Sequence, residues 1–181
     1  MRQTSKHRLF QLCLGIFGIG FLTFFDQLTK RLAVSHLKDA PSVSLLPGVF
    51  ELSYLENHGA AFGILKGQKA FLILMTGITL TVLIFLYFRI LGEQRYGCIR
   101  LMLAFLISGA IGNFIDRCFH DYVIDFFYFC LIDFPVFNVA DIYVTVSVIL
   151  LFLLFGFYYK EEDLDHLLHL LQFWKKRKTQ E

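Results

Sequence analysis

The stretch Ala70-Phe-Leu-Ile-Leu-Met-Thr-Gly-Ile-Thr-Leu-Thr-Val-Leu-Ile-Phe-Leu-Tyr-Phe88 contains no charged side chain. An α-helix crosses the hydrocarbon core of a bilayer with about 20 mostly apolar residues, so a stretch of this length and composition predicts a membrane-spanning helix. Three further uncharged stretches occur at Leu9–Phe25, Leu101–Ile115 and Ile142–Tyr159. The sequence therefore predicts an all-α membrane protein with four transmembrane helices, at about 9–28, 70–88, 99–115 and 142–159.

The composition of the whole chain agrees with this interpretation. Of the 181 residues, 56% are hydrophobic and only 18% are charged, whereas soluble domains average about 25% charged residues. This composition excludes a disordered chain and argues against a soluble domain. The net charge of +2 is too small to indicate a nucleic-acid partner, and we expect none.

The first stretch must be distinguished from a cleavable signal peptide, because a basic N-terminus precedes it. No small-x-small cleavage site follows, since Thr23-Phe24-Phe25 stands before Asp26. Leu12, which precedes Cys13, is not the small residue that a lipoprotein cleavage site would have. We therefore expect the first stretch to remain as a membrane anchor.

The positions of lysine and arginine predict the orientation. If the four helices alternate in direction, eleven of the 17 basic residues fall on the side of the two termini, and positive charge is enriched on the cytoplasmic side. Both termini should therefore be cytoplasmic. We divide the chain into a four-span domain, residues 1–160, and a cytoplasmic tail, residues 161–181, which runs from acidic through leucine-rich to basic and suits an amphipathic helix at the membrane surface.

With this topology, five ionisable residues gather on the non-cytoplasmic side. Asp26 follows the first span, Asp116 and Arg117 follow the third, and Asp141 opens the fourth, while Asp125 lies in the loop between the last two spans. Ionisable groups at membrane depth are costly, and they are usually paired or functional. Their convergence on one side predicts a site there.

The outer connections carry their own signals. Phe50–Tyr54 alternates apolar and polar residues, which predicts a half-exposed strand and a small β-rich region outside the membrane. The segment Asn57–Gly63 is either a turn into the second span or a place where a substrate backbone approaches closely, and His58 should be an exposed loop residue rather than a metal ligand. The connection Cys118–Ala140 is rich in phenylalanine, which predicts a position at the lipid headgroups.

Local spacing gives further expectations. Ser108 and Gly112 are four residues apart, as in packing motifs of membrane helices. Asp116 and Arg117 are adjacent on a helix, so their side chains diverge and each needs a partner elsewhere. Asp26 and Lys30, spaced i,i+4, can pair and are natural candidates.

Asp125 and Asp141 leave two interpretations open. Either one alone could be a helix cap or a solvated loop acid, whereas as a pair beside an apolar site they suggest an acid–base dyad. Cys118 and Cys130 could form a disulfide outside the cytoplasm, but we expect free thiols. No metal-ligand or nucleotide-binding motif is present, so we expect no metal and no cofactor.

Five blocks of the sequence together resemble the lipoprotein signal peptidase family, also called signal peptidase II. They occur in family order: Asp26-Gln27-Leu28-Thr29-Lys30, Asn57-His58-Gly59-Ala60-Ala61-Phe62-Gly63, Gly112-Asn113-Phe114-Ile115-Asp116-Arg117, Val123-Ile124-Asp125-Phe126 and Phe137-Asn138-Val139-Ala140-Asp141. The resemblance runs from the first span through the fourth. The segment 127–135 and the tail after Lys160 match no motif of the family.

The resemblance implies an aspartic endopeptidase of the bacterial inner membrane with its active site at the periplasmic face. Such enzymes remove signal peptides from diacylglyceryl-modified prolipoproteins and cut just before the lipidated cysteine. Membrane lipid would be the other partner, and we expect a monomer. The family's catalytic pair falls on Asp125 and Asp141, and its supporting or substrate-binding residues fall on Asp26, Lys30, Asn57, Gly59, Asn113, Asp116, Arg117 and Asn138.

Two other classes of protein remain as alternatives. A small four-helix transporter or proton-relay subunit would also place acids among membrane helices, although it would spread them through the membrane depth. A structural assembly partner would leave the pair Asp125 and Asp141 without a role.

Overall fold

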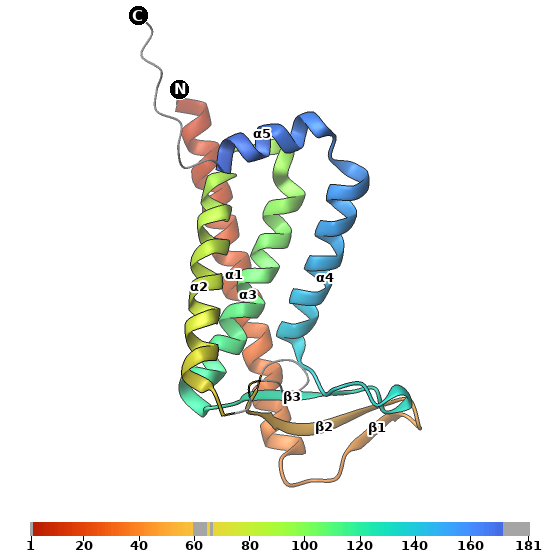
Figure 1. Cartoon of the computed structure of the whole chain (residues 1–181). Helices are drawn as coiled ribbons and strands as arrows, with labels where there is room; N and C mark the ends of the chain where they lie inside the picture. Colours follow the sequence, from red (N-terminus) through yellow and green to blue (C-terminus); the bar gives the residue numbers. More distant parts are fainter. Residues whose placement is uncertain (1, 60–64, 66, 172–181) are drawn as a thin grey trace, which may run out of the picture.

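The computed structural model describes residues 2–59, 65 and 67–171. A bundle is formed by α1 (Arg2–Leu37), α2 (Lys69–Arg89), α3 (Gly97–His120) and α4 (Val139–Leu153), which continues into a π-helical turn at Leu154–Tyr158 (Figure 1). All four helices are long and apolar enough to cross a membrane. Large apolar side chains such as Phe17, Phe152 and Phe157 point away from the bundle and are exposed, as expected of a surface that faces lipid. The prediction of four spans is confirmed.

Two helices extend beyond their predicted spans. We expected the first span to end near residue 28 with Asp26 at an interface, but α1 continues through Asp26 to Leu37. Likewise α3 continues to His120 instead of ending near residue 115. Asp26 and Asp116 are both buried, so their charges are satisfied inside the protein and do not mark the ends of the helices.

The most central helix is α3, which packs against α1, α2 and α4. Its glycines permit close approach: a Cβ atom on Gly112 would lie 2.3 Å from Asp26 Oδ2, and one on Gly109 would lie 2.6 Å from the carbonyl oxygen of Ala140. Ser108 is fully buried between these helices. The expected packing role of the small residues is confirmed.

At one end of the bundle, α5 (Glu161–Leu171) lies across the other helices (Figure 1). Leu167 is buried in a core cluster with Tyr96 and Tyr159, and Tyr96 closes the short 3-10 helix η2 (Gln94–Tyr96). The predicted helix in the tail is therefore present over residues 161–171, while residues 172–181 lie outside the described part.

A small antiparallel sheet closes the opposite end, with the strand order β1-β2-β3 (Figure 1). The strand predicted at residues 50–54 is confirmed and forms part of β2 (Phe50–Asn57). Its neighbours β1 (Val43–Leu46) and β3 (Val123–Tyr128) were not predicted. Because β3 and a short 3-10 helix η3 (Cys130–Ile132) lie within the connection that we expected to be a loop, Asp125 is a strand residue.

The sheet is held to the bundle by apolar contacts. Ala33 and Leu37, from the last turns of α1, form a buried cluster with Ile124 and Phe126 of β3. The far part of the sheet is aromatic, with ring contacts among Phe50, Phe127, Phe129, Phe134 and Phe137. This packing fixes β3, and therefore Asp125, against the ends of the helices.

Candidate active site

A buried cluster of charges lies where the sheet meets the bundle. Lys30 Nζ is 3.0 Å from Asp26 Oδ2 and 2.9 Å from Asp116 Oδ2. The three side chains are only 0–2% exposed. The expected pairing of Asp26 with Lys30 is confirmed, and the same ammonium group is the partner that Asp116 needed.

Further donors satisfy the two carboxylates of this cluster. The backbone N–H of Ala140 donates to Asp26 Oδ1 (2.9 Å), and Gln27 Nε2 donates to Asp116 Oδ1 (2.9 Å). Buried carboxylates are tolerated when such hydrogen bonds accompany the ion pair. We did not single out Gln27 from the sequence, although it stands beside Asp26 in the first block that resembles the family.

Asn113 connects this cluster to Asp141. Its Oδ1 accepts a hydrogen bond from Lys30 Nζ (2.9 Å), and its Nδ2 donates to Asp141 Oδ1 (2.9 Å). Asn113 lies one turn before Asp116 and Arg117 on α3, so it faces both α1 and the start of α4. The charged cluster therefore orients the amide that holds Asp141.

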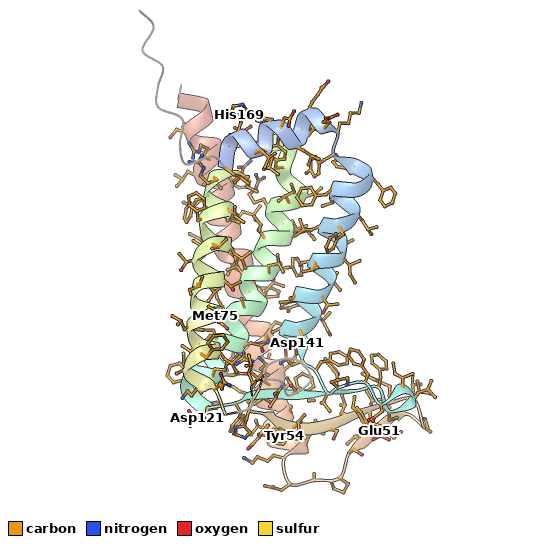
Figure 2. The ribbon with its side chains drawn as sticks, viewed as in Figure 1. Glu51, Tyr54, Met75, Asp121, Asp141 and His169 are labelled. Atoms are coloured by element: carbon orange, nitrogen blue, oxygen red, sulfur yellow. The ribbon has the colours of Figure 1, made fainter. Side chains whose placement is uncertain are left out.

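Asp141 lies in the first turn of α4, near the sheet (Figure 2). It forms a capping box with Asn138: the Asp141 N–H donates to Asn138 Oδ1, and the Asn138 N–H donates to Asp141 Oδ2, both at 3.1 Å. A capping box fixes the start of a helix by satisfying free N–H groups. Asp141 is therefore part of a helix cap, as one of the two interpretations held. Only its Oδ2 takes part in the capping box, and its Oδ1 accepts the hydrogen bond from Asn113.

Asp125 reaches the same place from β3 and is 1% exposed. Asn138 Nδ2 donates to its Oδ1 (2.6 Å), and Asn57 Nδ2 donates to its Oδ2 (2.9 Å). Burial, together with the nearby Asp141 carboxylate, raises the pKa of Asp125 to about 7. Asp125 can therefore keep its proton up to near neutral pH, as a carboxyl group that acts as a proton donor must.

Arg117 points away from Asp116, as its adjacent position predicted. Its Nη2 donates to the carbonyl oxygen of Gly59 (2.9 Å) and its Nη1 to that of Asn113 (3.2 Å). The Gly59 N–H in turn donates to Asn57 Oδ1 (2.9 Å). Arg117 thus positions the chain directly after β2, the strand that ends at Asn57.

All ten residues that we selected from the sequence therefore belong to one connected network of hydrogen bonds. His58 is exposed, as expected, and its ring packs against Tyr122. Residues 60–63 of the same block lie outside the described residues.

Other expectations from the sequence concern cysteines and metals. All four cysteines are free, including Cys118 and Cys130, which confirms the expectation of free thiols. Within residues 2–59, 65 and 67–171, no group of three or more His, Cys, Asp or Glu side chains is arranged to hold a metal ion.

Comparisons with known proteins agree with this geometry. Residues 19–157 match the family model for signal peptidase (SPase) II, Peptidase_A8. The chain is 42% identical over 141 residues to a lipoprotein signal peptidase of Streptococcus thermophilus strain CNRZ 1066, which covers 78% of this chain and 89% of that protein. It is 41% identical over 158 residues to the one of Streptococcus pyogenes serotype M1, which covers 87% and 97%.

Solved structures give the same result. A bacterial membrane enzyme determined by the in meso method at 2.3 Å resolution superposes with a TM-score of 0.69 at 30% identity, over 82% of this chain and 92% of that one. A related structure at 1.9 Å resolution gives 0.68 at 31% identity, over 81% and 94%. With matching fold, matching sequence and two buried or half-buried acids in one polar network, this chain belongs to the signal peptidase II family of aspartic peptidases.

Proposed function

We propose that Asp125 and Asp141 are the catalytic pair with which this protein removes signal peptides from diacylglyceryl-modified bacterial prolipoproteins, cutting just before the lipidated cysteine. The observation that carries this proposal is that one residue, Asn138, holds both carboxyl groups: its side-chain Nδ2 donates to Asp125 Oδ1, and its backbone N–H donates to Asp141 Oδ2. The two acids come from different elements, β3 and α4, and each keeps a fixed orientation.

The proposed chemistry uses one of the two acids in its ionised form and the other in its protonated form. The ionised carboxylate takes a proton from a water molecule, which attacks the scissile carbonyl carbon, and the protonated carboxyl donates to the carbonyl oxygen. When the tetrahedral intermediate collapses, the amine of the cysteine leaves with a proton from the pair. The raised pKa of Asp125 supports a carboxyl group that still holds its proton near neutral pH.

The other residues of the network act as supporting groups in this proposal. Asp26, Lys30 and Asp116 hold α1, α3 and the start of β3 together, since the Ile124 N–H also donates to Asp116 Oδ2 (3.3 Å). The amides of Asn57, Asn113 and Asn138 orient the two acids. Gly59 and Arg117 hold the chain that would border the substrate backbone.

We propose that the site faces the periplasmic side of the bacterial inner membrane and that both termini are cytoplasmic. The start of α1 and α5 share one end of the bundle, and the site occupies the other (Figure 1), which agrees with the distribution of basic residues. A phosphatase that is active only in the periplasm should be inactive when it is fused after Lys160, because the fusion stays in the cytoplasm. An active fusion would reverse the topology and move the site to the cytoplasmic face.

The lipid on the substrate supports this arrangement, because a diacylated peptide stays in the bilayer and its scissile bond can only be reached at membrane depth. The partners are therefore the prolipoprotein and membrane lipid. We infer a monomer without a cofactor, because one chain supplies the whole network. Strong chelators should leave cleavage unchanged, and a loss with EDTA that zinc restores would require another mechanism.

The decisive experiment uses purified protein and a fluorescent peptide that carries a diacylglyceryl cysteine. We expect cleavage before that cysteine and none of the matched peptide without lipid. A proton-relay subunit would cleave neither peptide.

The positions of the buried charges also argue against a proton relay. Among the described residues, the buried charged side chains all lie near the sheet: Asp26, Lys30, Asp116 and Asp125. A relay would spread such groups through the membrane depth.

A further inference from the structure

Strand β2 contains an irregularity directly opposite the proposed catalytic strand. Leu52 pairs with Phe127, whereas the next pair on the same ladder is Leu55 with Asp125. Three steps along β2 therefore match two steps along β3, which means that β2 carries one extra residue there. Without this bulge, continuing the register from Leu52 would place Tyr54 opposite Asp125.

The bulge determines which side chains share a face with Asp125, because a shift by one residue exchanges the two faces of a strand. Tyr54 and Glu56 are directed to the other face, where the Tyr54 hydroxyl donates to Glu56 Oε1 (3.0 Å) and Lys38 pairs with the same oxygen (3.0 Å). Leu55 and Asn57 are left on the face of Asp125. The contact from Asn57 Nδ2 to Asp125 confirms this assignment.

Leu55 differs from its neighbours on that face. Directly opposed residues of antiparallel strands have Cβ atoms about 5 Å apart, so Leu55 adjoins the Asp125 carboxyl. It is 44% exposed, whereas Asp125 is 1% exposed. Asn57 forms a hydrogen bond of the network, whereas Leu55 is an apolar side chain that remains exposed beside a buried acid.

The free edge of β3 restricts how a peptide can approach. The Ile124 N–H already donates to Asp116 Oδ2, and the N–H groups of Phe126 and Phe127 donate to the carbonyl oxygen of Phe137. These donors are therefore not available to a peptide that would add itself as a further strand. A peptide that reaches Asp125 must pass over the face that carries Leu55.

We propose that Leu55 is a specificity-determining contact, which packs against an apolar side chain of the signal peptide within three residues of the scissile bond. An extended peptide advances about 3.3 Å per residue, so a group about 5 Å from Asp125 meets side chains close to the reacting carbonyl. The bulge serves this contact by placing leucine, instead of tyrosine, next to the acid. The inference rests on the proposed catalytic role of Asp125.

The test compares lipidated peptides of one sequence that carry either Leu or Ala at each of the three positions before the modified cysteine. For the parent protein and L55A, kcat/KM is measured for each peptide. We expect the Leu-over-Ala preference at one position to fall about 10-fold in L55A, mainly through KM. The control is L45A, because Leu45 is 50% exposed but lies on β1, which does not border β3; its preferences should equal those of the parent.

A second measurement does not depend on turnover. A benzophenone side chain replaces Leu55 in the D141N protein, and ultraviolet light should couple it to the uncleaved peptide within three residues of the scissile bond. Coupling only to lipid overturns the inference, as does an L55A protein whose kcat/KM is unchanged or falls equally for every peptide. If the parent protein cleaves the peptides, these outcomes contradict only the role of Leu55, and the proposed function stands. If the parent cleaves none of the peptides, both the proposed function and the role of Leu55 are rejected.

Discussion

The two ends of the bundle are both held by charged side chains, but in opposite environments. At the sheet end, Lys30 lies between Asp26 and Asp116, and these groups are almost completely buried. At the α5 end, Arg95 pairs with Asp163, and the two side chains are 51% and 17% exposed. The same chemistry of ion pairs therefore has different consequences at the two ends.

A buried ion pair is costly to form and depends on every partner, because removing one leaves an uncompensated charge. A solvent-exposed pair contributes little and is screened by salt. At the α5 end, stability comes instead from Leu167 in the core and from neutral contacts, such as the Tyr96 hydroxyl donating to the carbonyl oxygen of Asp163 (2.8 Å). The difference teaches that the sheet end is built for a fixed geometry and the α5 end for attachment.

The largest expected effect would separate chemistry from stability at the sheet end. D125N and D141N should each lower cleavage by about 10²–10⁴-fold, because either change removes the base or the proton donor. Both proteins should stay folded, since asparagine keeps the shape of the side chain. Turnover is measured with the lipidated peptide and folding by melting in detergent, with D163N at the α5 end as the control that retains activity. Near-normal turnover in either variant would reject the catalytic pair.

Replacing Lys30 tests the buried cluster of charges at the sheet end. K30M leaves two carboxylates buried without their cation and should lower the free energy of unfolding by about 3–5 kcal/mol. The matched change R95M removes a cation from the exposed pair and should leave the melting temperature close to that of the parent. Equal losses in the two variants would mean that burial does not distinguish the two ends.

The pH dependence of stability should have opposite signs at the two ends. The pKa of Asp125 is raised to about 7, mainly by burial, whereas an unfolded aspartate titrates near about 4. The protonated form of Asp125 is thus favoured in the folded state. Its contribution to the free energy of unfolding is fully present below about pH 4 and is lost as the pH rises through about 7. The hydrogen bond from Arg95 lowers the pKa of Asp163, so its contribution is present above the unfolded pKa and lost on acidification.

Melting temperatures between pH 3 and pH 9 test this contrast. In D125N, the decline between about pH 4 and 7 that the parent owes to Asp125 should disappear, whereas in D163N only the acid side of the curve should change. In the parent, cleavage should also fall above about pH 7, as Asp125 loses its proton. A D125N curve parallel to that of the parent would contradict the raised pKa.

The smallest expected effect lies at the α5 end. R95A should leave cleavage unchanged, and any decrease in melting temperature should be seen only at low salt, because exposed ions are screened at higher ionic strength. A large loss that persists in high salt would show that the exposed pair orders α5 and that the two ends depend on their ion pairs to a similar degree.

The sequence predicts the spans because the thickness of a bilayer sets the length of an uncharged helix. It does not predict where α1 and α3 end, because these ends depend on contacts between distant parts of the chain. Asp116 is satisfied by Lys30 and Gln27, more than 80 positions away, and Asp26 accepts a hydrogen bond from the N–H of Ala140 in addition to its pairing with Lys30. Strand β2 is visible through its alternation, but Val123, Ile124 and Phe126 of β3 are all buried, so β3 has no alternating pattern. The bulge depends on pairing between strands and has no local signal.

In the site too, contacts between residues close in sequence could be predicted, and contacts between distant residues could not. The pairing of Asp26 with Lys30 follows from helical spacing, and the cap formed by Asn138 and Asp141 could have been predicted from the N-x-x-D pattern. The central position of Asn113 could not, because its partners lie on α1 and α4. The roles of the remaining residues came from resemblance to the family, and the spacing alone did not supply them.

The central position of α3 has a consequence for biosynthesis. Asp116 and Arg117 lie in the last turns of α3, and ionisable side chains at membrane depth are costly unless they are paired. Because α1 is translated first, Lys30 is already in the membrane when Asp116 emerges. Asn138, Ala140 and Asp141 emerge last, with α4. A nascent chain that stops before α4 therefore lacks Asp141 and the Asn138 amide that holds Asp125, so the proposed catalytic pair is complete only when the bundle is complete.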